Sequence, residues 1–61
     1  MAWEVNASDE GGLCHIAQFH HKHNADTHFQ QCLHDYEMAS PPYEIEDEDV
    51  IVFEDEDGSA D

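Results

Sequence analysis

The sequence predicts a small α+β domain in which one helix packs on a three-stranded sheet, in the order strand, strand, helix, strand (ββαβ). Three observations lead to this fold class. Apolar and polar residues alternate in two early segments, apolar residues recur at helical spacing in the middle, and a β-forming apolar run follows two prolines. With 61 residues the chain can form one domain at most, which we place at residues 1–57, with a frayed end at 58–61.

The first two strands are predicted near residues 2–7 and 13–20, joined as a hairpin. In the first segment the apolar face consists of Trp3, Val5 and Ala7. In the second, one face holds Leu13, Ala17 and Phe19, and the other holds Cys14 and Ile16. Gly11 and Gly12 can supply the positive φ of the turn between them. A helix over 13–23 is the alternative for the second segment, but paired glycines are a poor helix start.

The helix is predicted over residues 27–39. Its apolar face is formed by Phe29, Cys32, Leu33 and Tyr36. Asn24 or Asp26 can cap its start, because a side-chain oxygen accepts a backbone N–H there. Pro41 and Pro42 prevent the helix from continuing, since proline lacks the N–H and clashes with the preceding turn.

The third strand is predicted from YEIEDEDVIVFE, residues 43–54, and is strongly acidic. Its Val, Ile and Phe residues are good strand formers, whereas Asp and Glu are poor ones. Part of the 50–53 run would then pack under the helix. The other expected core residues are Trp3, Val5, Phe19, Phe29, Leu33 and Tyr36.

The charge of the chain restricts what it can bind. Sixteen Asp or Glu residues face one basic residue, Lys22, for a formal net charge of −15. Such a surface repels nucleic-acid phosphates and anionic membranes and attracts basic proteins. Adaptation to high salt is an alternative cause of the acidity. No enzyme activity or cofactor is expected, because so small a domain has little room for a catalytic cleft and neighbouring Cys14 and His15 would point to opposite sides of a strand.

The stretch EDEDVIVFEDED, residues 46–57, is the predicted binding segment. A strand advances about 3.3 Å per residue, close to the roughly 3.4 Å between phosphates of one DNA strand. An extended acidic strand could therefore present charge to a groove built for phosphates. The alternative is that the charges only keep a sheet edge from aggregating. The predicted partner-binding residues are Glu44, Glu46, Asp47, Glu48, Asp49, Val50, Ile51, Val52, Phe53, Glu54, Asp55, Glu56 and Asp57.

In size, acidity and lack of arginine the chain resembles small phage proteins that mimic DNA and block host nucleases, restriction enzymes or polymerases. Its predicted strand order is also similar to that of some short phage inhibitors of host RNA polymerase. The resemblance is one of composition and implies a nucleic-acid-binding host protein as the partner and the host cytoplasm as the location. Two copies could also pair through an exposed sheet edge. The start of the chain has no basic and apolar leader, and no segment is apolar enough to span a membrane, which favours a cytoplasmic protein.

Two other interpretations stay open. VIVF followed by EDED resembles a SUMO-interacting motif, in which an apolar strand adds to a sheet edge and an acidic flank contacts basic residues. The six histidines suggest a zinc site. Its candidate ligands are Cys14, His28 and Cys32, and His20 or His23 could complete the set of four. There is no Cys-x-x-Cys pair, and Cys32 also fits the apolar helix face, so no metal is expected.

Overall fold

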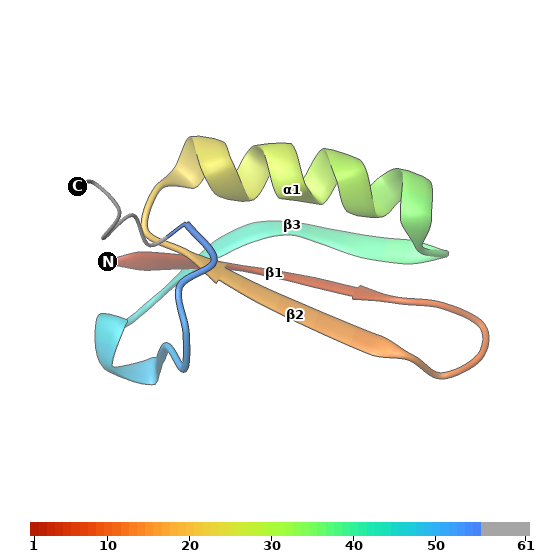
Figure 1. The fold of residues 1–61 in the computed structure, drawn as a ribbon, viewed down its shortest axis with the longest axis horizontal. Helices are drawn as coiled ribbons and strands as arrows, with labels where there is room; N and C mark the ends of the chain where they lie inside the picture. The colour runs from red at the N-terminus through yellow and green to blue at the C-terminus, as the bar shows by residue number, and fades with distance from the viewer. Residues whose placement is uncertain (56–61) are drawn as a thin grey trace.

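A computed structural model describes residues 1–55 of the chain and confirms the predicted fold class. A three-stranded antiparallel sheet has the strand order β2-β1-β3, and α1 lies along one of its faces (Figure 1). The elements are β1 Ala2–Ser8, β2 Cys14–Phe19, α1 Lys22–Asp35, β3 Met38–Ile45 and a 3₁₀ turn, η1, Asp47–Asp49. Within this part of the chain no helix is long and apolar enough to cross a membrane. The predicted frayed end at 58–61 lies outside the described residues.

The β1–β2 hairpin forms as predicted. Its register pairs Trp3 with Phe19 at one end and Ser8 with Cys14 at the other. One carboxylate oxygen of Asp9 accepts hydrogen bonds from the backbone N–H groups of the turn at residues 11 and 13, at 3.0 and 3.1 Å. Gly12 has a φ of 89°, a conformation that glycine adopts without steric cost.

The helix begins earlier than predicted, at Lys22 rather than near residue 27. Neither Asn24 nor Asp26 caps it: the N-cap residue is His21, which makes no side-chain capping bond. The carboxylate at this end comes from Asp55, which accepts hydrogen bonds from the backbone N–H groups of residues 20 and 21, just before the first turn. A capping group more than thirty residues away cannot be recognised from the local sequence, which explains the error.

The helix also ends earlier than predicted, at Asp35, and the two prolines are not its stop. Tyr36 is already extended, and its N–H donates to the Cys32 carbonyl at 2.9 Å. Pro41 and Pro42 lie inside β3, which is an edge strand. Tyr43 pairs with Glu4 and Ser40 with Asn6, so the two prolines face the single residue Val5 across a bulge. Edge strands and bulges tolerate the missing proline N–H.

The third strand is Met38–Ile45 and not the predicted segment 43–54. Its last pair joins Ile45 to Ala2, the first residue of β1. Like charges placed opposite one another also destabilise a strand. The first acidic tetrad, residues 46–49, therefore leaves the sheet, with residues 47–49 forming η1, and residues 50–55 belong to no strand. The prediction of an extended acidic strand is wrong for this segment.

The core lies between α1 and the sheet. Its buried members are Val5, Ala7, Ala17, Phe19, Ala25 and Cys32, and Trp3, Phe29, Tyr36 and Ala39 pack against them partly buried. Leu33 was predicted to be a core residue but is 50% exposed, because the buried row of α1 runs through Ala25 and Cys32 and leaves it to one side. Four of the six buried residues, the three alanines and Cys32, have small side chains. So small a core indicates a domain of modest stability.

Candidate functional site: the open face of the sheet

We call the sheet face opposite α1 the open face, because no α-helix among residues 1–55 covers it (Figure 1). Side chains alternate along each strand, so the residues between the buried ones point to this side. Its residues are Glu4, Asn6, Ser8, Cys14, Ile16, Gln18, Met38, Ser40 and Tyr43. Ile16 and Met38 are 59% and 65% exposed, so this face presents apolar as well as polar groups to the surroundings.

A polar network lies at the centre of the open face. The Tyr43 hydroxyl donates to one Glu4 carboxylate oxygen, and the Gln18 amide donates to the other at 3.0 Å. The Asn6 amide donates to the Tyr43 hydroxyl at 3.0 Å. Burial raises the pKa of Glu4, but the hydrogen bonds from Tyr43 and Gln18, with a smaller contribution from the nearby Asn6 amide, outweigh it, so the pKa lies below its ordinary value. Glu4 is therefore a fixed negative charge on this face at neutral pH.

The segment after η1, residues 50–55, lies against β2. The Glu54 N–H donates to the Gln18 carbonyl at 2.7 Å, and the Ile51 N–H donates to the Gln18 side-chain oxygen at 2.9 Å. Phe53 stacks on His20, with ring centroids 3.5 Å apart and an interplanar angle of 11°. These contacts leave Gln18 only 7% exposed. Ile51 and Val52 remain 91% and 58% exposed.

Asp55 holds this segment to the start of α1. Its carboxylate accepts hydrogen bonds from the backbone N–H groups of His20 and His21, at 2.7 and 3.1 Å, and from the Asn24 amide at 2.8 Å. Burial raises the pKa of Asp55, but these hydrogen bonds, that of His20 foremost, outweigh it, and the pKa lies below the ordinary aspartate value. Asp55 was predicted to bind a partner, and the structure instead places it in an internal contact.

Replacing Asp55 by Asn is expected to destabilise the fold by about 1–2 kcal/mol, since it weakens a helix cap formed by a charged acceptor. Urea unfolding followed by circular dichroism measures the change. The matched control is Glu54→Gln, because that side chain is exposed and only its backbone is bound. Equal stability of the two variants would contradict the capping role of Asp55.

The same contact has a pH signature. Because the folded-state pKa of Asp55 is depressed, its contribution is complete above the unfolded value of about 3.9 and is lost as the pH falls through the folded-state pKa. The stability difference between the wild-type chain and Asp55→Asn should therefore be constant near neutral pH. It should shrink only below about pH 4.

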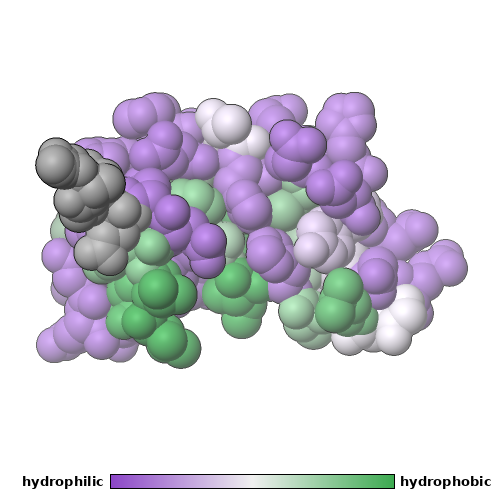
Figure 2. Space-filling view, in the orientation of Figure 1, coloured by the Kyte–Doolittle hydropathy of each residue, from purple (hydrophilic) through white to green (hydrophobic). Residues whose placement is uncertain are grey.

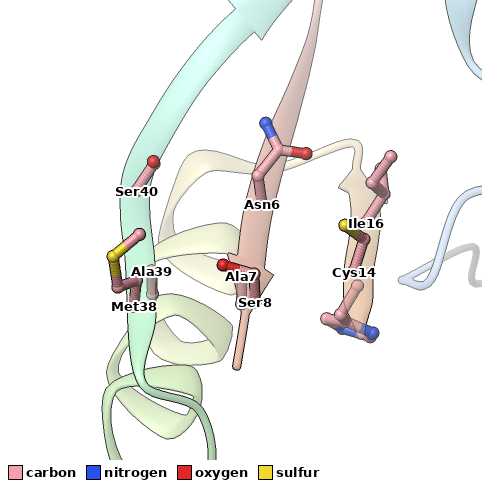
Figure 3. Close-up of a pocket in the computed structure, with 9 residues that line it drawn as sticks. Asn6, Ala7, Ser8, Cys14, Ile16, Met38, Ala39 and Ser40 are labelled. Atoms are coloured by element: carbon pink, nitrogen blue, oxygen red, sulfur yellow. The ribbon is translucent and has the colours of Figure 1, made fainter. Parts of the chain in front are cut away.

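Two hollows flank Ile16 on the open face. One, of about 290 Å³, lies over Asn6 and Ser8, with Cys14 and Ile16 on one side and Met38 on the other (Figure 3). The other, of about 420 Å³, lies between Ile16 and the segment after η1 and is lined by Glu4, Ile16, Gln18, Ile51, Val52 and Glu54. Figure 2 shows hydrophobic side chains gathered over β2 and the segment after η1. The two hollows and these hydrophobic side chains together form a shallow, mainly apolar surface.

Exposed carboxylates stand at one end of this surface, around η1. Glu44 and the whole first tetrad, residues 46–49, are exposed. Within residues 1–55, the cation that pairs with one of these carboxylates is the N-terminal amine of Met1, which lies 3.2 Å from the Asp47 carboxylate. Lys22 pairs instead with Asp26 on α1, at 3.1 Å. This end of the molecule therefore carries a dense negative charge.

The remaining predicted residues differ in their placement. Val50 and Phe53 are half-buried, whereas Glu54 is exposed. Glu56 and Asp57 lie outside the described residues. The alternation of residues along the second strand predicts that Cys14 and Ile16 point away from the core. This alternation is the signal in the sequence for the open face. Met38 could not be found in this way, because it was assigned to the helix.

The candidate metal ligands are separated in part. His28 and Cys32 lie together on α1, but their neighbour from the sheet is His15 and not Cys14. Cys14 is exposed on the open face. Burial lowers the pKa of His28, and His15 adds to this while Glu54 opposes it. Burial raises the pKa of the Cys32 thiol, and Asp35 adds to the rise.

The fold and the site define a small acidic ββαβ domain whose open sheet face is covered in part by the segment after η1. No protein-family model, no curated protein and no solved structure matches the chain.

Proposed function

We propose that this protein acts by stoichiometric binding and that the open face, with the acidic end around η1, occupies a basic surface of a partner protein. The observation that supports this most is the juxtaposition of exposed apolar side chains with exposed carboxylates. Ile16, Ile51 and Val52 supply apolar area, and residues 46–49 supply charge at its border. Contiguous exposed apolar patches on monomeric proteins are commonly interaction sites.

The partner class follows from the charge. A chain with net charge −15 and one Lys or Arg is attracted to surfaces rich in Lys and Arg, and such surfaces are typical of proteins that bind nucleic acids. The proposal is thus a charge mimic of nucleic acid that acts in the cytoplasm, as an inhibitor if it excludes the natural ligand. It does not use the spacing of a strand, because η1 is a 3₁₀ turn, which advances only about 2.0 Å per residue.

The test compares two triple variants that remove the same charge from opposite ends of the molecule. Glu46→Gln, Glu48→Gln and Asp49→Asn neutralise the end around η1, and keep Asp47 for its contact with the N-terminus. The control set is Glu10→Gln, Asp35→Asn and Glu37→Gln, all exposed and near the hairpin turn or the end of α1 (Figure 1).

With a partner captured from the native lysate, the η1 triple is expected to bind about tenfold more weakly, since three exposed ion pairs contribute up to about 1 kcal/mol each. The control triple should bind like the wild-type chain. Duplex DNA added to the complex should release the protein if it occupies a nucleic-acid-binding surface. An equal loss of affinity in both triple variants would show that only the net charge matters. Unchanged affinity of the η1 triple would show that the acidic residues there serve solubility and not binding.

A further inference from the structure

The side chains of His15, His28 and Cys32 converge between β2 and α1. The two Nε2 atoms of the histidines lie 2.8 Å apart. The Cys32 sulfur completes the group, and the three potential ligand atoms all lie within 4.8 Å of one another. The cluster is at the edge of the core: Cys32 is 2% exposed, whereas both histidines are half-buried and reachable from solvent.

The fold holds each of these groups in place. His28 and Cys32 are one helical turn apart, so they share a face of α1. His15 reaches them from β2, where its ring stacks on Tyr36 with centroids 5.3 Å apart. On the other side, the His28 ring packs against Phe19, with centroids 5.2 Å apart. The aromatic neighbours restrict both imidazoles, so the three donors are organised before any ligand arrives.

We propose that His15, His28 and Cys32 form a binding site for a divalent zinc ion, with two imidazole nitrogens and one thiolate as ligands. Imidazole and thiolate are the ligands that zinc prefers in proteins, and three protein ligands leave a fourth tetrahedral position for solvent. Ligand atoms of tetrahedral zinc lie about 3.4–3.6 Å apart, from bonds of about 2.0–2.3 Å. The histidine nitrogens would separate slightly and the sulfur would approach, which small side-chain rotations allow.

In the metal-free chain, the short contact between the two Nε2 atoms requires one of them to donate a proton to the other. When both Nε2 atoms bind the metal, this proton is carried on Nδ1 of the same imidazole instead, so both rings stay neutral, and the proton of the Cys32 thiol is released to solvent. The dication enters a chain with net charge −15, which favours its binding over that of any anion. The bound ion would connect β2 to α1 directly, so it should stabilise the fold. The sequence alone favoured no metal. The new observation is that the His15 side chain lies beside those of His28 and Cys32.

Cobalt(II) is the probe for this site, because a cysteine thiolate bound to it gives a charge-transfer band in the near ultraviolet. Tetrahedral coordination adds intense d–d bands in the visible region. The full-length chain, reduced and freed of metal, is titrated with cobalt and then with zinc. Both bands should saturate at equimolar cobalt and disappear when zinc displaces it.

Matched variants distinguish this site from adventitious binding. Cys32→Ala and His15→Phe should each lose the charge-transfer band, the latter while keeping a ring to stack on Tyr36. Cys14→Ala and His23→Phe change an exposed cysteine and an exposed histidine and should keep it. Histidine pairs elsewhere, such as His21 beside His23, contain no sulfur and cannot give this band.

Thermal unfolding supplies the second measurement. Zinc should raise the melting temperature of the wild-type chain and of Cys14→Ala, but not that of Cys32→Ala, because only the folded site binds the ion. No charge-transfer band in the wild-type chain would overturn the proposal. A band that survives in Cys32→Ala and vanishes in Cys14→Ala would also overturn it. His15→Phe tests the site independently if Cys32→Ala folds poorly.

Discussion

Raising the salt concentration from about 0.1 M to about 1 M is expected to weaken the complex with the basic partner by about a hundredfold or more. The Debye length falls from roughly 10 Å to about 3 Å over this range, so exposed charges no longer attract across the interface. The carboxylates concerned are Glu44, residues 46–49 and Glu54, all of which are exposed. Binding isotherms at several salt concentrations measure the slope.

The η1 triple variant is the control for this slope. Because it removes three of the charges on which the attraction depends, its affinity should fall less steeply with salt than that of the wild-type chain. The control triple at the other end should keep the wild-type slope. The loss should appear mainly in the association rate, since exposed charges act by steering the encounter.

A complex that does not respond to salt would contradict the charge-based proposal. It would indicate that the apolar residues Ile51 and Val52 dominate, as in addition of a strand to a partner's sheet edge. Titration with free SUMO would then test that alternative directly. In the structure Phe53 already stacks on His20 and the Glu54 N–H is bound to β2, so this segment would have to leave its site in order to pair with a partner.

Phe19→Ala is expected to unfold most of the protein at 25 °C. Phe19 is 5% exposed and is the largest side chain in the buried cluster, where the other members include Val5 and three alanines. Removing a buried phenylalanine side chain costs about 3–5 kcal/mol. A domain below about 70 residues rarely has more than about 3–5 kcal/mol of stability. Far-ultraviolet circular dichroism and urea titration measure the outcome.

Leu33→Ala is the matched control, because the sequence predicted both residues to lie in the core. Leu33 is half-exposed, and its truncation should change the free energy of unfolding by no more than about 0.5 kcal/mol. A large loss for Leu33→Ala together with a small one for Phe19→Ala would show that α1 packs with a different face toward the sheet.

The hairpin and the fold class could be predicted because their signals are local. Alternation in residues 2–7 and 13–20, and paired glycines between them, specify two strands and a turn without reference to the rest of the chain. Alternation also separated Ile16 from the core residues Ala17 and Phe19. The helix was found, but its bounds were not, since Asp55 binds the backbone just before its start and residues 38 and 39 pair with β1 instead of continuing it.

Only the tertiary structure decided where the third strand lies and what the acidic segment does. β3 begins at Met38 because β1 offers pairing partners only from Ser8 back to Ala2, and a bulge on an edge strand accepts the two prolines that were expected to end the helix. Asp55, more than thirty residues away in the chain, fixes the backbone that leads into α1.

The cluster of His15, His28 and Cys32 was likewise predicted in part from the sequence and decided in part by the tertiary structure. Sequence spacing alone places His28 and Cys32 on one helix face. The third group is His15 rather than Cys14 because the two are strand neighbours and point to opposite sides of the sheet, and only the one on the side of α1 can reach the helix. Local patterns thus determined which elements form. The pairing of strands and the packing of α1, which depend on contacts between residues far apart in the chain, determined where each element ends and which side chains meet.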